Sequence, residues 1–154
     1  MLNKRLAAAT LSATVALTTS LVMHYEGVRY EAYLDPIGIP TICYGHTAGV
    51  VMGQVKTAAE CLELLRLDVT AAIKSVDALA KDELPVERRS ALSSFTLNVG
   101  ASKFGRSTLL KELNKGEVAA SCAWLDEWVR AGGKIYPGLV IRRAEERALC
   151  EVGL

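Results

Sequence analysis

Residues 26–46 read EGVRYEAYLDPIGIPTICYGH, and this stretch decides the fold that we expect for the first half of the chain. It begins where an apolar run ends and passes into a segment, residues 31–56, that is rich in Gly, Pro, Tyr, Ile and Val. Aromatic and β-branched residues favour strands, whereas residues 35–38 and Gly49 favour turns. The stretch therefore predicts a helix that ends near Glu26, followed by a small antiparallel sheet.

Three polar side chains in this stretch have the chemistry to cut a glycosidic bond. Glu26 and Asp35 stand nine positions apart, and Thr41 follows six positions later. A glycosidase needs one acid to protonate the leaving oxygen and a second carboxylate to activate water on the opposite face of the sugar. We assign Glu26 as the acid, and Asp35 and Thr41 as the residues that hold the water. The plainer alternatives are an ion pair of Glu26 with Arg29, a turn role for Asp35 and a strand position for Thr41.

The stretch also resembles the catalytic segment of phage lysozymes of the T-even type, glycoside hydrolase family twenty-four. The matching residues are Glu26, Gly27, Arg29, Tyr33, Asp35, Gly38, Thr41, Gly45 and His46. The resemblance implies an endolysin, an N-acetylmuramidase that hydrolyses by inversion the β-1,4 bond between N-acetylmuramic acid and N-acetylglucosamine in bacterial peptidoglycan. It implies no metal or organic cofactor. The chain departs from the T-even type in its added N-terminal run, its four cysteines, and Ile39 and Pro40 just before Thr41. This proline stiffens the approach to Thr41.

The expected fold class is α+β and lysozyme-like. A small N-terminal α/β lobe with an antiparallel sheet should occupy about residues 25–60, and a larger all-helical lobe about residues 81–154. A long helix over about residues 57–80 should join them, because Thr57 and Glu60 form a capping box. Apolar residues then recur every three or four positions, as on one face of a helix. They are Leu62, Leu65, Val69, Ala72, Ile73 and Val76.

Proline and glycine mark the ends of the later helices, since proline is favoured at a helix start and glycine after its end. The sequence predicts helices over residues 86–99, 107–114, 117–131 and 137–150. Gly132 and Gly133 are expected to end the third of these. Trp124 and Trp128 lie four positions apart on it and are expected to lie in the core.

Six further residues are candidates for substrate binding. Tyr44, Gly45 and His46 are expected to shape the cleft wall, and a structural role is the alternative for His46. The segment FTLNVGASKFGRSTLL, residues 95–110, also resembles the family, and it brings Asn98, Ser107 and Thr108 as residues that could face the sugar chain. Helix capping or turn formation is the alternative for these three.

A second family pattern, G-L-x-x-R-R-x-x-E, is present near the C-terminus. It comprises Gly138, Leu139, Arg142, Arg143 and Glu146. Arg142 and Arg143 are therefore supporting residues, and one of them is expected to pair with Glu26 or to support the cleft. A solvated helix face is the alternative.

Composition narrows the class of protein. The chain has 154 residues, of which 51% are hydrophobic, and this suits one compact domain. Its formal net charge is +1 and it has no basic stripe, so nucleic acid is not an expected partner. We expect a monomer whose partner is peptidoglycan.

The four cysteines predict two disulfides. They are Cys43, Cys61, Cys122 and Cys150, which allow three connectivities. No C-x-x-C motif or close Cys/His cluster is present, so no metal site is expected. We favour Cys43–Cys61 and Cys122–Cys150, each within one half of the chain, and four buried thiols are the alternative.

The N-terminus resembles an export signal. Lys4 and Arg5 precede an uncharged run of 18 residues, Leu6–Met23, in which Ala, Thr and Ser occupy 11 positions. This length is just enough to cross a thin bilayer, but the run is only weakly apolar. A cleaved signal peptide, a stable anchor and an ordinary buried helix are alternatives. We favour a marginal span that inserts for export and later leaves the bilayer.

Some phage lysozymes have a signal-anchor-release segment, and the chain resembles that subgroup. The resemblance implies an exported protein that associates transiently with the host inner membrane through Leu6–Met23 and then acts in the periplasm. On this view residues 1–24 are the export helix and residues 25–154 the catalytic domain. Two other functions stay open: a catalytically silent peptidoglycan-binding module, and a membrane-lesion protein whose active part is Leu6–Met23.

Overall fold

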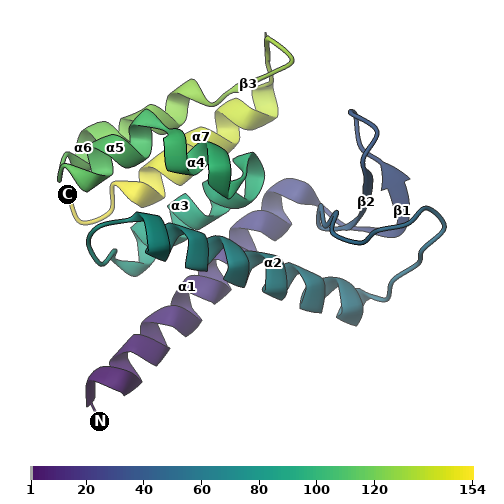
Figure 1. Ribbon diagram of the computed structural model, residues 1–154, viewed down its shortest axis with the longest axis horizontal. Coiled ribbons are helices and arrows are strands. Elements are labelled where there is room, and N and C mark those ends of the chain that lie inside the picture. The colour runs from purple at the N-terminus through teal and green to yellow at the C-terminus, as the bar shows by residue number, and fades with distance from the viewer. Residues whose placement is uncertain (1) are drawn as a thin grey trace.

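The computed structural model describes the backbone of residues 2–154 and the side chains of residues 7–154. The helices are α1 (Leu2–Glu26), α2 (Ala58–Leu79), α3 (Val86–Val99), α4 (Ala101–Arg106), α5 (Thr108–Asn114), α6 (Val118–Ala123) and α7 (Pro137–Cys150), with a short 3₁₀ helix η1 (Trp124–Glu127). The strands are β1 (Arg29–Leu34), β2 (Pro40–Cys43), β3 (Arg130–Ala131) and β4 (Lys134–Ile135). The β1–β2 hairpin lies at one end of α2 and most of the helices gather at the other end (Figure 1). The predicted α+β class is confirmed.

The predicted sheet is the antiparallel β1–β2 hairpin. Tyr33 pairs with Thr41 and Leu34 with Pro40, so the hairpin brings the residues after β1 close to the start of β2. Ile42 and Cys43 are buried together with Cys61 of α2. This small cluster attaches the hairpin to α2, and it therefore fixes where the hairpin turn lies relative to the helices.

Helix α2 forms as its sequence predicts. Thr57 Oγ1 accepts a hydrogen bond from the Glu60 backbone N–H at 3.2 Å, and the Thr57 N–H donates to Glu60 Oε2 at 2.7 Å. This reciprocal capping box satisfies two of the N–H groups that a helix start leaves free. The buried face comprises Cys61, Leu65, Val69, Ala72, Ile73 and Val76, which matches the predicted spacing except at the exposed Leu62.

Helix α1 packs on the body through one narrow stripe in its second half. Thr14, Thr18 and Val22 follow one another at intervals of four residues and are fully buried. Val22 joins a cluster with Leu65, Val69 and Ile73 of α2, whereas most of residues 7–13 are exposed and project from the body (Figure 1). By length and composition alone, Ala7–Glu26 could also cross a membrane.

The predicted helix over residues 117–131 is wrong. Helix α6 ends at Ala123, η1 follows, and Arg130–Ala131 pairs with Lys134–Ile135 as the hairpin β3–β4. Gly132 and Gly133 have φ values of 56° and 79°. Two adjacent residues with positive φ form the tight turn that matches strand twist, so this glycine pair joins two strands and does not end a helix.

Only one of the two tryptophans departs from the expected core position. Trp124 is 40% exposed. Trp128 packs against the core, where its ring meets Phe95 edge to face with 5.2 Å between ring centroids. The rest of the helical core includes Leu92, Phe104, Leu109 and Leu125, all of them fully buried.

Both favoured disulfides are present, Cys43–Cys61 and Cys122–Cys150. The second joins α6 to the end of α7 across 28 positions of sequence, and both of its cysteines are fully buried. Closing a loop of that size restricts the unfolded chain and typically contributes about 2–4 kcal/mol. We expect the double variant Cys122→Ala, Cys150→Ala to lose that much unfolding free energy in urea titrations of the oxidised protein. An unchanged urea midpoint would contradict this expectation.

Candidate active site

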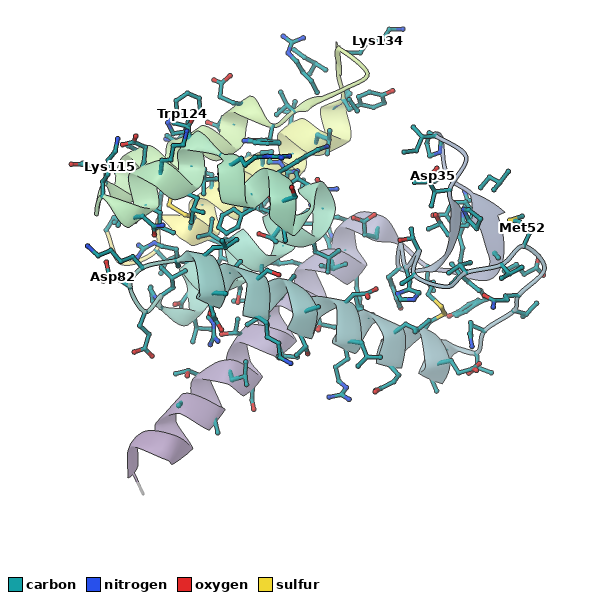
Figure 2. All side chains as sticks on the ribbon, viewed as in Figure 1. Asp35, Met52, Asp82, Lys115, Trp124 and Lys134 are labelled. Carbon is teal, nitrogen blue, oxygen red and sulfur yellow. A yellow bond between two sulfur atoms is a disulfide. The ribbon has the colours of Figure 1, made fainter. Side chains whose placement is uncertain are left out.

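A hollow of about 600 Å³ lies between the β1–β2 hairpin and the helices. We call it the cleft. Its lining includes Glu26, Asp35 and Thr41, which come from the end of α1, the hairpin turn and β2. Figure 2 shows Asp35 on the hairpin at the edge that faces the helices. The fold therefore gathers the three residues assigned to catalysis around one space.

Glu26 is the last residue of α1, and the residues on either side of it define this helix end. Gly27 follows with a φ of 65°, a left-handed conformation that commonly ends a helix. Tyr25 Oη donates a hydrogen bond to Glu145 Oε2 of α7 at 2.6 Å. Burial, together with this bond, raises the pKa of Tyr25 above its usual value, so the hydroxyl stays a donor.

Arg142 of α7 holds the Glu26 carboxylate. Its Nη1 donates to Glu26 Oε1 at 2.6 Å, and the Glu26 side chain remains 29% exposed to the cleft. The Arg142 guanidinium also lies 4.8 Å from the ring centroid of Tyr25. Glu26 Oε2 lies 3.8 Å from the point that a Cβ of Gly45 would occupy. That is an ordinary contact distance, but Gly45 has a φ of 86°, so a side chain there would be strained.

Behind Glu26 runs a buried chain of alternating charges. Glu146 is fully buried and accepts hydrogen bonds from Arg142 at 3.0 Å, from Ser94 Oγ at 2.7 Å and from Arg143. Arg143 in turn donates to Asn98 Oδ1 at the cleft surface. Burial lowers the pKa of Arg143, and the neighbouring Glu146 opposes that shift. This chain of contacts therefore connects Glu26 to Asn98 through buried charged side chains, whose positions are restricted because each needs its charged partner.

Asp35 is oriented by the turn that it forms. Its Oδ1 accepts hydrogen bonds from the backbone N–H groups of Ile37 at 2.9 Å and Ile39 at 2.8 Å. Its Oδ2 has no hydrogen-bond partner among the residues that the structure describes. The turn therefore uses one carboxylate oxygen and leaves the other for the cleft.

Thr41 is oriented in a similar way. Its hydroxyl donates to the carbonyl of Ile39 at 2.9 Å, and the residue is 4% exposed. Because the proton of Oγ1 is used in this bond, the oxygen presents its lone pairs to a further donor. Asp35 and Thr41 therefore offer two acceptors at the same side of the cleft.

The other predicted site residues divide between the cleft and the scaffold. Those that line the cleft are Tyr44, Gly45, Asn98 and Arg143. Arg142 lies beside it, at Glu26. Ser107 and Thr108 do not line it: Ser107 Oγ accepts from the Leu110 backbone N–H at 3.1 Å, which makes it the N-cap of α5. For Ser107 the structure shows the capping alternative, and Thr108 is the first residue of α5.

His46 belongs to the scaffold as well. Its Nδ1 lies 2.7 Å from Asp68 Oδ2 of α2, and its Nε2 lies 3.0 Å from the carbonyl oxygen of Ala48. His46 therefore ties the loop after β2 to α2.

Sequence reasoning missed several cleft residues. Trp128, Arg130 and Lys103 also line the cleft. The one signal for Arg130 was the glycine pair two residues later, which suits a tight turn between strands as well as a helix end. Within the described part of the chain, no three His, Cys, Asp or Glu side chains gather as a metal site.

Comparisons with known proteins show the family and the fold. The family model described as phage lysozyme matches residues 23–146. The SAR-endolysin of Bacteriophage PS119 is 44% identical over 126 residues, which are 81% of this chain and 75% of that protein. Among solved structures, the muramidase domain of SpmX from Asticaccaulis excentricus matches with a TM-score of 0.80 at 32% identity, over 87% of this chain and 94% of that one.

Two forms of one further protein differ in their likeness to this structure. The active form of the P1 phage endolysin Lyz matches with a TM-score of 0.79 at 25% identity, over 93% of this chain and 92% of that one. Its secreted inactive form matches with a TM-score of 0.54 at 26% identity, over 67% of this chain and 74% of that one. The arrangement of helices and hairpin described above is therefore much nearer to the active form.

Proposed function

Because the chain belongs to the phage lysozyme family, we propose that it is an endolysin that cuts the β-1,4 bond between N-acetylmuramic acid and N-acetylglucosamine in peptidoglycan. The observation that carries the proposal is the convergence of Glu26, Asp35 and Thr41 on one open cleft. The family makes the chain a lysozyme-type glycoside hydrolase, and the cleft supplies the acid and the water-holding pair that this reaction needs.

In this proposal Glu26 is the general acid. Its side chain reaches the cleft, and Arg142 holds one of its oxygens. A held acid meets the glycosidic oxygen in a fixed position, which is the main requirement for efficient proton transfer. Arg142 acts through Glu26 and is a positioning residue.

The water in this proposal lies between Asp35 and Thr41. Asp35 Oδ2 is the base, since its Oδ1 is occupied by the turn N–H groups. Thr41 Oγ1 accepts a hydrogen bond from the other O–H of the same water, since its own proton is used on Ile39. A water held at both protons directs its lone pair at the sugar, so attack from the face opposite to Glu26 would invert the anomeric carbon.

The proposal extends to where the enzyme acts. We propose that the chain is exported, is held transiently in the host inner membrane through Leu6–Met23, and then acts in the periplasm as a monomer. Support comes from the length and composition of Ala7–Glu26 and from the relative named a SAR-endolysin. Since Glu26 ends α1, withdrawal of α1 into a bilayer would take the acid away from Arg142. The arrangement described here would then be the active one.

Product analysis tests the proposed reaction. Purified peptidoglycan sacculi are digested with the protein, and the soluble products are separated and weighed by mass spectrometry. Fragments with a free reducing N-acetylmuramic acid are the expected result. Anhydro ends would show a transglycosylase, free stem peptides would show a peptidase or amidase, and intact sacculi would favour a binding module. Any of these three would overturn the proposal.

A further inference from the structure

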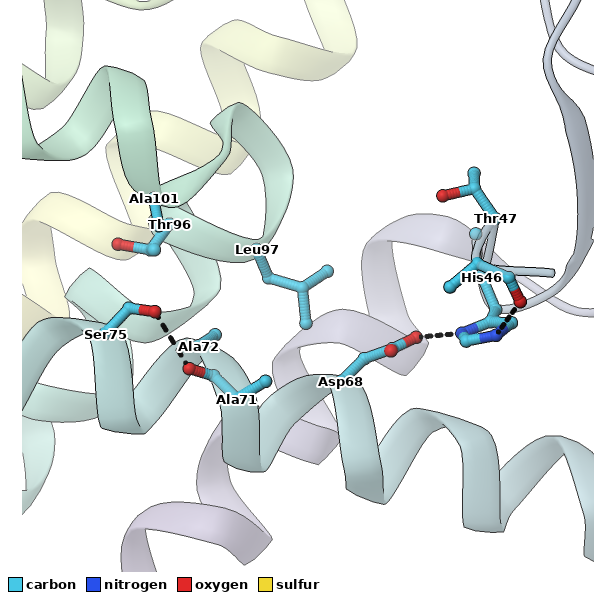
Figure 3. Close-up of a pocket in the computed structure, with 11 residues that line it drawn as sticks. His46, Thr47, Asp68, Ala71, Ala72, Ser75, Thr96, Leu97 and Ala101 are labelled. Carbon is cyan, nitrogen blue, oxygen red and sulfur yellow. Dashed lines mark hydrogen bonds and ion pairs between the residues drawn. The ribbon is translucent and has the colours of Figure 1, made fainter.

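The carboxylate of Glu26 has one hydrogen-bond partner among the side chains that the structure describes, and this partner is Arg142. The charged pair beside the cleft, His46 and Asp68, is closed on itself with 2.7 Å between Nδ1 and Oδ2 (Figure 3), and neither residue is bonded to Glu26. The position of the acid therefore depends on the position of the Arg142 guanidinium, and on whatever holds that group in place.

Four contacts surround the Arg142 guanidinium, and the fourth differs in kind from the others. Nη1 donates to Glu26, Nε donates to Glu146 at 3.0 Å, and Nη2 donates to the carbonyl oxygen of Ser94 at 3.2 Å. The fourth contact is with Tyr25, because the guanidinium carbon lies over the ring, 4.8 Å from its centroid. The electrons of an aromatic face attract a cation, and the ring also keeps away water that would compete for the N–H groups. Tyr25 therefore helps to keep Arg142 where it reaches the acid.

The Tyr25 side chain lies outside the cleft. It is absent from the residues that line the cleft, and it lines a neighbouring hollow of about 440 Å³ together with Glu26 and Arg142. Its hydroxyl donates to Glu145 Oε2 at 2.6 Å, and burial together with this bond raises the pKa of Tyr25 above its usual value. The hydroxyl therefore keeps its proton and stays bonded to Glu145, and any effect of Tyr25 on the reaction passes through Arg142.

Glu145 is a competitor for the guanidinium of Arg142. The two residues are three positions apart on α7, a spacing that places side chains next to each other. Three pairs of opposite charge at this spacing are bonded in the described part of the chain: Glu63 with Arg66 at 2.8 Å, Glu112 with Lys115 at 2.7 Å, and Arg143 with Glu146.

The corresponding pair of Arg142 with Glu145 is missing from the described residues. Arg142 is paired with Glu26 and Glu146, whereas Glu145 accepts the hydrogen bond from Tyr25. The Tyr25 hydroxyl thus occupies a carboxylate that could otherwise draw the guanidinium away from the acid.

We propose that Tyr25 is a positioning residue for the acid. Its ring holds the Arg142 guanidinium toward Glu26, and its hydroxyl keeps Glu145 away from that guanidinium. This inference rests on the proposed function, in which Glu26 protonates the leaving oxygen. It also gives the end of α1 two parts in the site, because Tyr25 and Glu26 are consecutive residues and meet α7 together.

The first test removes both the ring and the hydroxyl. The parent and Tyr25→Leu are compared as full chains on soluble peptidoglycan strands, and kcat and KM are measured from the release of reducing N-acetylmuramic acid. We expect Tyr25→Leu to lower kcat about tenfold, the scale of one lost, partly buried cation–π contact. KM should stay within about twofold, because a residue that aims the acid without contacting the substrate affects the chemical step.

The second test separates the hydroxyl from the ring. Tyr25→Phe keeps a ring over Arg142 but releases Glu145, so we expect kcat to fall about threefold, the scale of one exposed charge pair. Adding Glu145→Gln removes the competing charge and should return kcat to within about twofold of the parent's value. Glu145→Gln alone should lower kcat less than Tyr25→Phe does. A role of Tyr25 in folding alone would give no such rescue.

Tyr30→Leu is the matched control. Tyr30 is a 44% exposed tyrosine of β1 that is absent from the lining of the cleft, so its substitution should leave kcat and KM unchanged. Circular dichroism measures the folded fraction of every variant, and each kcat is expressed per folded molecule. If Tyr25→Leu does not fold, Tyr25→Phe and its rescue by Glu145→Gln still decide the matter.

Three results would overturn the positioning role and leave the proposed function intact. The first is equal kcat for Tyr25→Leu and Tyr30→Leu. The second is a higher KM with unchanged kcat in Tyr25→Leu, which would make Tyr25 a substrate contact. The third is a Tyr25→Phe protein that Glu145→Gln does not rescue. A parent protein that releases no reducing N-acetylmuramic acid would instead remove the proposed function, and this inference with it.

Discussion

Glu26→Gln is expected to lower the rate of peptidoglycan hydrolysis by about 10²- to 10⁴-fold, the contribution typical of a general acid. Glutamine has nearly the shape of glutamate, and its Oε1 can still accept the bond from Arg142 that Glu26 accepts at 2.6 Å. The helix end and the cleft should therefore stay as they are, while the group that protonates the leaving oxygen is lost. The measurement is release of reducing sugar from purified sacculi at fixed protein concentration.

Glu31→Gln provides the control for this change. Glu31 is an exposed glutamate of β1, close in sequence to Glu26 and absent from the lining of the cleft. Its substitution should leave the rate of hydrolysis within about twofold of the parent's rate, since substitutions at surface residues away from the active site have small effects. Equal rates for the parent and Glu26→Gln would refute Glu26 as the acid. Lysis of cells that persists in the same variant would then point to the apolar segment Leu6–Met23.

Glu146→Gln is expected to cost about 3–5 kcal/mol of unfolding free energy, the largest stability effect that we expect of a single side chain here. The Glu146 carboxylate is fully buried between Arg142 and Arg143, which are 4% and 1% exposed. Removing its charge leaves Arg143 in a dry site without a countercharge, and burial already lowers the pKa of that guanidinium. Urea unfolding followed by circular dichroism measures the change.

A more exposed pair at the C-terminal end of α7 is the control for Glu146. Arg147 and Glu151 are also four residues apart, with Nε and Oε1 separated by 2.8 Å, but their side chains are 38% and 36% exposed. Glu151→Gln should cost less than about 1 kcal/mol, because water screens such pairs. Similar losses for the two variants would contradict the central role given to the buried chain of charges. We also expect the Glu146→Gln protein that does fold to be less active. In this variant Arg142 would lose the charged partner that orients it toward Glu26.

Several elements could be predicted because their signals are local. The capping box at Thr57 and Glu60 depends on residues three apart. The hairpin after Glu26 depends on adjacent strand and turn residues. The family resemblance of residues 26–46 predicted that Glu26, Asp35 and Thr41 belong to one site. The later hairpin was missed because a glycine pair suits two structures equally well, a helix end and a tight turn between strands.

The contacts that could not be predicted join residues distant in the sequence. The pair between His46 and Asp68 spans 22 positions, and neither side chain carries a local signal that names its partner. Ser107 stands in a segment that resembles the family, yet only the structure shows that its hydroxyl caps α5. In such cases the same side chain can lie on the surface, cap a helix or line a site, and the tertiary packing determines which of these occurs.

The sequence by itself determined which groups this protein carries: two carboxyl groups and a hydroxyl at fixed spacing, four cysteines that allow three connectivities, and an N-terminal run long enough to cross a thin bilayer. Only the tertiary structure decided which of two adjacent arginines holds the acid. Arg142 reaches Glu26 across 116 positions because α7 and the end of α1 meet in the folded chain. Residue types set what a site can do, but the distances between distant side chains arise only when the helices pack.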